Sequence, residues 1–191
     1  MKIAIYSGSF NPIHLGHQKL AEYLIDQQLV DEVWFVVSPC NPLKDPASQL
    51  DEFMRLDMVV EAISGNPKLK ASDVEFTMPV PSYTIDTLHQ LTKLYPQHEF
   101  ALMIGSDNAV IFNQWKNYQE LLETYPVYVY PRKGYDFYTV ADVYPQMQLL
   151  DTPYYDISST QIRKLIQQGE DVSRWLSASV IGYIRENGLY I

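Results

Sequence analysis

Two histidines near the start of the chain have a spacing that suits chemistry on a phosphate group. His14 and His17 lie in "GSFNPIHLGH", residues 8–17. On a helix that begins near residue 14, this spacing places both imidazoles on the same side. Imidazole N–H groups can donate to phosphate oxygens and offset charge that develops at a phosphorus centre. We interpret the pair as a candidate polyphosphate site, with two surface histidines or a zinc site as the alternatives.

The residues around the two histidines suit the approach of an anion to the main chain. Gly8 follows an apolar run and lets the backbone come close to a ligand, and Ser9 adds a hydroxyl. The N–H groups that enter the helix near Gly16 favour negative charge. Zinc would need three or four ligands, and neither a cysteine nor a further histidine is close in sequence. The segment matches neither a Walker loop nor a G-x-G-x-x-G turn.

A second segment of the same kind lies near the end of the chain. In "ISSTQIRK", residues 157–164, Ser158 and Gln161 have the spacing of a capping box ahead of an apolar-periodic stretch. This predicts a helix N-terminus with Arg163 within the first turn or so. Free N–H groups, the helix dipole and a guanidinium all favour a bound polyphosphate there. An ordinary capped helix with a solvated arginine would explain the segment alone, but two phosphate-type segments in one acidic chain favour a ligand.

The elements that must position these segments alternate between strand and helix. Strands are expected at residues 3–6, 33–37, 69–76, 100–105 and 127–130. Helices are expected at residues 20–29, 53–63, 84–95, 158–169 and 178–188. The alternation predicts an α/β fold with a three-layer, doubly wound, Rossmann-like parallel sheet and right-handed crossovers. Ligands of such folds bind at the carboxyl ends of the strands, where the histidine segment begins.

Composition limits the class of protein. The 191 residues, 47% of them hydrophobic, predict one domain over 1–191, with 158–191 as a small helical part. The net charge of −9 argues against a nucleic-acid partner, so Lys44, Arg132–Lys133 and Arg163–Lys164 are the basic positions of interest. The chain shows neither a signal peptide nor a membrane span, and Cys40, its single cysteine, suits a reducing cytoplasm. We expect a cytoplasmic protein with small-molecule substrates; a homo-oligomer is left open.

The two segments resemble the HxGH and ISSTxIR motifs of the nucleotidyltransferase superfamily. Five further segments are similar to bacterial nicotinate-nucleotide adenylyltransferases, namely "SPCNPLKD" at 38–45, "PSYTIDTL" at 81–88, "LMIGSDNAVIFNQW" at 102–115, "YPRKG" at 130–134 and "VIGYIRENGLY" at 180–190. Together they span nearly the whole chain in family order. The resemblance implies a fold of nucleotidyltransferase type and the step of NAD biosynthesis that joins ATP and nicotinate mononucleotide to give deamido-NAD and pyrophosphate. The attack would be in line, with no covalent enzyme intermediate.

The resemblance also implies roles for individual residues. His14, His17 and Arg163 would be catalytic. The ATP site would contain these three together with Gly8, Ser9, Phe10, Ser158 and Ser159. Nicotinate mononucleotide would contact Lys44, Tyr83, Thr84, Asp107 and Trp115. Magnesium would arrive with ATP as part of the substrate, held by phosphates and water, so we expect no dedicated metal ligand in the protein.

Preference for the acid over the amide has a physical basis. A helix that starts at Thr84 would point the N–H groups of residues 83–85 at a nicotinate carboxylate, whereas a carboxamide would present an NH₂ donor to them. Trp115 could stack on the pyridine ring, although packing alone would also explain it. Two positions depart from the family pattern. Asn11 replaces the usual aspartate and could cap its turn, and Ser177–Ala178 replaces a valine–proline-like start, where Ser177 could be an N-cap.

Three other functions remain open from the sequence. An adenylyltransferase with another acceptor, nicotinamide mononucleotide or phosphopantetheine, would carry the same motifs. A nucleotide sensor that has lost catalysis is less favoured because His14, His17 and Arg163 are all present. A scaffold role would leave both polar, phosphate-type segments unexplained.

Overall fold

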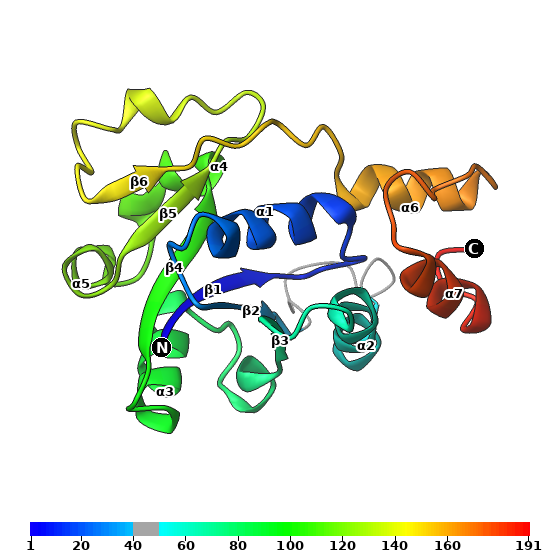
Figure 1. The fold of residues 1–191 in the computed structure, drawn as a ribbon, viewed down its shortest axis with the longest axis horizontal. Helices are drawn as coiled ribbons and strands as arrows, with labels where there is room; N and C mark the ends of the chain where they lie inside the picture. Colours follow the sequence, from blue (N-terminus) through cyan, green and yellow to red (C-terminus); the bar gives the residue numbers. More distant parts are fainter. Residues whose placement is uncertain (40–49) are drawn as a thin grey trace.

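The fold is built around one six-stranded sheet. The computed structural model describes residues 1–39 and 50–191. All strand pairs are parallel, and the strand order is β3-β2-β1-β4-β5-β6 (Figure 1). The strands are β1 (Lys2–Gly8), β2 (Glu32–Val37), β3 (Leu69–Ser72), β4 (Glu99–Gly105), β5 (Val127–Tyr130) and β6 (Met147–Leu149). The predicted doubly wound parallel sheet is confirmed, and its order reverses between β1 and β4.

Helices connect the strands and cover both faces of the sheet. The α-helices are α1 (Leu15–Asp26), α2 (Glu52–Ile63), α3 (Thr84–Leu94), α4 (Ser106–Ala109), α5 (Tyr118–Thr124), α6 (Ser159–Gln167) and α7 (Ala178–Glu186). Short 3₁₀ helices lie at η2 (Val74–Thr77), η3 (Phe112–Gln114) and η4 (Phe137–Thr139). Figure 1 shows α6 and α7 at the end of the molecule toward which β1 runs. They therefore lie at the carboxyl edge of the sheet.

Alternation along β1 separates two hydrophobic cores. Ala4 and Tyr6 point into the core that α1, α2, α6 and α7 cover. Ile3 and Ile5 point into the opposite core, under α3 and α5. Because side chains of a strand alternate between faces, a central strand that is apolar throughout is buried on both sides. This explains why the short apolar run at 3–6 is typical of a buried strand.

Helix starts follow the capping residues. Ser158 caps α6 and Ser177 caps α7, in each case by accepting from a main-chain N–H of the first turn. α3 begins at Thr84, and Tyr83 occupies the N-cap position. The predicted helix starts at residues 84 and 178 are confirmed, and the unusual Ser177–Ala178 pair forms an ordinary cap.

Three short elements differ from the expectation. The segment 69–76 was expected to be one strand, but β3 ends at Ser72 and η2 follows. Neither α5 nor β6 was expected. β6 is three residues long, pairs with β5 alone and has one buried residue, Met147, so its apolar pattern is weak. In the part of the chain that the structure describes, every helix is too short or too polar to span a membrane.

Candidate active site

The loop between β1 and α1 is fastened by side chains from two other helices. Its carbonyl oxygens accept from Arg55 of α2 at Ser9, from Arg163 of α6 at Asn11 (2.8 Å), and from Ser159 of α6 at Pro12 (2.9 Å). Carbonyl oxygens repel a phosphate, and here donors of the protein occupy them. The two motifs, 147 to 152 residues apart, are therefore in direct contact.

His14 and His17 form a stacked pair at the start of α1. Their ring centroids are 3.6 Å apart with an interplanar angle of 24°. The main-chain N–H of His14, the N-cap residue, donates to Nδ1 of His17 at 3.2 Å. Because Nδ1 accepts, a neutral His17 carries its proton on Nε2. The local hydrogen bond thus leaves the ring with one donor, of the kind that a phosphate oxygen accepts.

Both histidines are held in the neutral state. Burial, together with the nearby Arg132 guanidinium, lowers the pKa of His14 from 6.5 to about 4. Burial, His14 and Arg132 lower the pKa of His17 well below its usual range. At neutral pH the pair therefore offers N–H donors without a fixed positive charge. The side chain of His14 is buried, and its Nδ1 has no hydrogen-bond partner in the described part of the chain.

Gly16 is required by the position of the His14 ring. A Cβ at Gly16 would lie 3.0 Å from two ring atoms of His14 and 3.1 Å from Cβ of Tyr155. The N–H of Leu15 donates to the carbonyl of Trp175 at 2.8 Å. Among the described residues, the N–H of Gly16 has no such acceptor. The start of α1 therefore offers an anion fewer free N–H groups than the sequence suggested.

The start of α6 is the second donor cluster. Ser158 and Gln161 form the predicted capping box, with N···O distances of 2.9 and 3.2 Å. The hydroxyl of Ser158 donates to Gln161 at 3.0 Å, and that of Ser159 is donated to Pro12. Both hydroxyl protons are thus in use within the protein. Among the described residues, the N–H groups of Ser159 and Thr160 donate to no protein acceptor and remain for a ligand.

Asp107 and Arg132 meet at the carboxyl ends of β4 and β5. Nε of Arg132 lies 3.8 Å from Oδ1 of Asp107, which is beyond a hydrogen bond. That oxygen is buried and has no hydrogen-bond partner among the described residues. A Cβ at Gly105 would collide with it, so glycine is needed where β4 ends. The arrangement offers a buried acceptor beside a cation.

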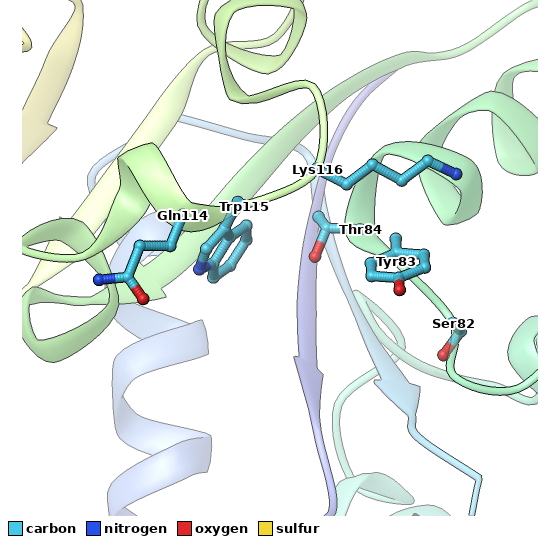
Figure 2. Close-up of a pocket in the computed structure, with 6 residues that line it drawn as sticks. All are labelled: Ser82, Tyr83, Thr84, Gln114, Trp115 and Lys116. Atoms are coloured by element: carbon cyan, nitrogen blue, oxygen red, sulfur yellow. The ribbon is translucent and has the colours of Figure 1, made fainter.

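A pocket of ≈ 290 Å³ lies between the start of α3 and the end of η3. Its lining residues are Ser82, Tyr83, Thr84, Gln114, Trp115 and Lys116 (Figure 2). Figure 2 shows Trp115 and Thr84 arriving from the two segments that form the pocket. Lys116 extends over the Tyr83 ring, 4.9 Å from its centroid, and pairs with Asp86 at 2.8 Å. The first-turn N–H groups of Thr84 and Ile85 have no protein acceptor among the described residues.

Comparison with known proteins decides the family. The family model "Cytidylyltransferase-like" matches residues 5–165. A relative from Cytophaga hutchinsonii, named "Probable nicotinate-nucleotide adenylyltransferase", is 45% identical over 94% of this chain and 93% of its own length. A relative of the same name from Flavobacterium johnsoniae is 41% identical over 100% and 99%. The chain belongs to the nicotinate-nucleotide adenylyltransferase family.

A solved structure shares the fold of this nucleotidyltransferase. It is the Plasmodium falciparum nicotinic acid mononucleotide adenylyltransferase complexed with NaAD, and its TM-score is 0.84 at 23% identity. The alignment covers 99% of this chain and 97% of that one. The resemblance in sequence and the predicted fold are thus both confirmed.

The structure brings together most of the side chains that the sequence assigned to the ATP site, at the carboxyl edge of the sheet. His14, His17, Ser158, Ser159 and Arg163 meet around one loop. The ring of Phe10 is different, because it is only 2% exposed and packs on Gly8 and His17. Any contact of Phe10 with ATP would therefore use its main chain. Lys44 lies outside the described residues.

Two arginines near the candidate site were missed by the predictions from sequence or left without a role in them. Arg55 is 2% exposed and donates to three carbonyl oxygens, of Ser9, Leu50 and Ser38. Nothing in the helical pattern of residues 53–63 separated this arginine from a surface one. Arg132 belongs to a basic pair that the sequence flagged, and the structure places it near both histidines and Asp107.

The side chain of Asn11 has a different partner from the one that the sequence suggested. Asn11 was expected to cap its own turn, but its side chain accepts from the hydroxyl of Tyr190.

Among the described residues, no group of three or more His, Cys, Asp or Glu side chains has the geometry of a metal site.

Proposed function

We propose that this enzyme transfers the adenylyl group of ATP to nicotinate mononucleotide and releases pyrophosphate, the reaction that its relatives' name describes. The observation that carries the proposal is the meeting of two donor clusters on one loop. The stacked, neutral histidines stand at the start of α1, and Arg163 with the free N–H groups of α6 stands on the other side. Together they provide donors along the length of a polyphosphate.

At the ATP end, the protein supplies position and hydrogen bonds. His14 and His17 donate to oxygens at the α-phosphorus, where charge changes during the in-line attack. The N–H groups of Ser159 and Thr160, with the Arg163 guanidinium, hold the β- and γ-phosphates that leave as pyrophosphate. Gly8, Ser9 and the main chain of Phe10 border the triphosphate. Magnesium enters with ATP as part of the substrate and balances charge on the phosphates.

At the other end, the pocket beside α3 takes the pyridine nucleotide. The N–H groups of Thr84 and Ile85 donate to the nicotinate carboxylate, and the Trp115 indole stacks on the ring, with Tyr83 beside it. The unpartnered Oδ1 of Asp107 accepts from a ribose hydroxyl. Lys44 contributes to the phosphate of the mononucleotide. A neutral carboxamide would bring an N–H against N–H groups, so the acid is preferred.

Arg132 joins the ATP site in this proposal. Its guanidinium lies near Asp107, and its charge contributes to the lowered pKa of both imidazoles. It would hold an α-phosphate oxygen together with them. The whole chain would act as one nucleotidyltransferase domain, in which residues 158–191 carry the pyrophosphate end. A cytoplasmic location accompanies the proposal and is checked by cell fractionation.

The deciding experiment measures pyrophosphate release from ATP and magnesium with three acceptors in parallel. These are nicotinate mononucleotide, nicotinamide mononucleotide and phosphopantetheine. Strong preference for the nicotinate form supports the reaction and the role of α3. Equal use of both pyridine nucleotides would keep the reaction and refute the carboxylate argument. Tight ATP binding without release in all three would favour a nucleotide sensor.

A further inference from the structure

The segment after α7 turns back to the loop between β1 and α1. Gly188 has φ = 58° and Tyr190 has φ = 64°, both in the left-handed region. For a tyrosine this conformation is strained, and it persists where surrounding contacts determine it. The contact that Tyr190 makes in this conformation is a hydrogen bond from its hydroxyl to Oδ1 of Asn11, 179 residues earlier.

Asn11 connects this hydrogen bond to the arginine of the pyrophosphate site. Its side-chain oxygen accepts from Tyr190, while its main-chain oxygen accepts from Nη1 of Arg163 at 2.8 Å. Among the described residues, the other nitrogen, Nη2, donates only to the hydroxyl of Thr160, at 3.4 Å. The position of the guanidinium therefore depends mainly on where the Asn11 carbonyl lies.

The surroundings of Tyr190 make its hydroxyl a stable donor. The ring packs against the core that α6 and α7 share. Burial raises the pKa of Tyr190 well above its usual value, although the Arg163 and Arg55 guanidinium groups act against this rise. The proton that Asn11 accepts is thus retained at all pH values at which the enzyme would work.

We propose that Tyr190 is a positioning residue for the pyrophosphate end of the site. Its hydroxyl fixes Asn11, and Asn11 in turn holds Arg163 aimed at the β- and γ-phosphates. The role of Arg163 in this inference rests on the proposed function. The contact of Tyr190 with Asn11, and of Asn11 with Arg163, is independent of it.

Tyr190→Phe removes the hydroxyl and keeps the ring. The direct readout is calorimetric binding of inorganic pyrophosphate with magnesium to the enzyme, which needs no acceptor. We expect pyrophosphate to bind about tenfold more weakly, because Asn11 loses its donor and Arg163 its fixed anchor. In steady state, KM for ATP should rise and kcat should fall, while KM for nicotinate mononucleotide stays unchanged.

The matched control is Tyr183→Phe. The Tyr183 hydroxyl, on α7, donates to Asp57 of α2 at 2.9 Å. Among the described residues, it makes no hydrogen bond to the loop between β1 and α1. This variant should keep wild-type pyrophosphate affinity. Asn11→Ala provides the second test, since it leaves the carbonyl that Arg163 uses but removes the acceptor of Tyr190. Adding Tyr190→Phe to Asn11→Ala should then change pyrophosphate affinity by less than about twofold.

The outcomes separate the two proposals. Wild-type pyrophosphate affinity in folded Tyr190→Phe, an equal rise of both KM values, or additive losses in the double variant would each overturn the positioning role. Failure of the wild-type enzyme to release pyrophosphate with nicotinate mononucleotide would instead overturn the proposed function. If Tyr190→Phe does not fold, Asn11→Ala with unchanged pyrophosphate affinity overturns the positioning role.

Discussion

His14 should make the stability of the enzyme depend on pH between about 4 and 6.5. Its pKa is about 4 in the folded protein, against 6.5 when it is unperturbed. Between these values the unfolded chain binds a proton that the folded protein excludes, so stability must fall as pH falls. The stability that depends on a neutral His14 is fully present above about pH 6.5 and is lost progressively as the pH falls to about 4. At about pH 5 the loss from this one residue is roughly 2 kcal/mol.

The perturbation is His14→Asn, which keeps a polar side chain of similar reach but removes the titrating group. Urea unfolding of both proteins at about pH 7.5 and about pH 5 gives two changes in free energy, and carboxylates common to both cancel in their difference. The wild type should lose about 2 kcal/mol more than the variant. His17 stays in the variant, and burial and Arg132 still lower its pKa. An equal loss in both proteins would refute the reasoning, because it would mean that His14 is protonated as readily in the fold as in the open chain.

Two further predictions concern the first turn of α1. His17→Ala should lower kcat by about 10²–10³-fold, the scale for loss of one transition-state donor, while urea unfolding stays cooperative; near-normal turnover in pyrophosphate release would contradict the role of the pair. Gly16→Ala should lower kcat about 10- to 100-fold, because the new Cβ would lie 3.0 Å from the His14 ring and displace that ring. The free energy of unfolding should stay near the wild-type value, because alanine has the higher helix propensity. Gly182→Ala in α7, where a Cβ meets nothing within 4 Å, is the control and should add up to about 1 kcal/mol of stability without a change in kcat.

The strands that the sequence predicted best are those whose side chains are buried on both faces of the sheet. β1, β2, β4 and β5 are short apolar runs, and their residues contribute to one core or the other in alternation. β6 was missed because its apolar residues, Met147 and Leu149, pack into one core only. The η2 segment was misassigned because Glu75, which is polar, is buried there by hydroxyl partners. Local sequence carries no sign of such a partner.

The site shows the same division. Motif spacing predicted that the two histidines share one side of the helix start and that a capping box forms, since both are relations between residues three apart. The contacts that orient the motifs span 46 to 152 residues and join main-chain oxygens to side chains. A carbonyl oxygen is present at every position, so the sequence cannot indicate which one Arg55 or Arg163 will bind.

Net charge is a poor guide to this site because it averages over positions that the fold separates. The chain carries −9 overall, yet Arg55, Arg163 and Arg132 come from α2, α6 and the end of β5 to the surroundings of one loop. Within the described residues, neither Arg55 nor Arg163 forms an ion pair, and Arg132 has only the distant Asp107. Asn11 fits this pattern, because an aspartate there would place a carboxylate beside Arg163. The carboxamide accepts the Tyr190 proton without cancelling the positive charge, which remains available to an anionic substrate.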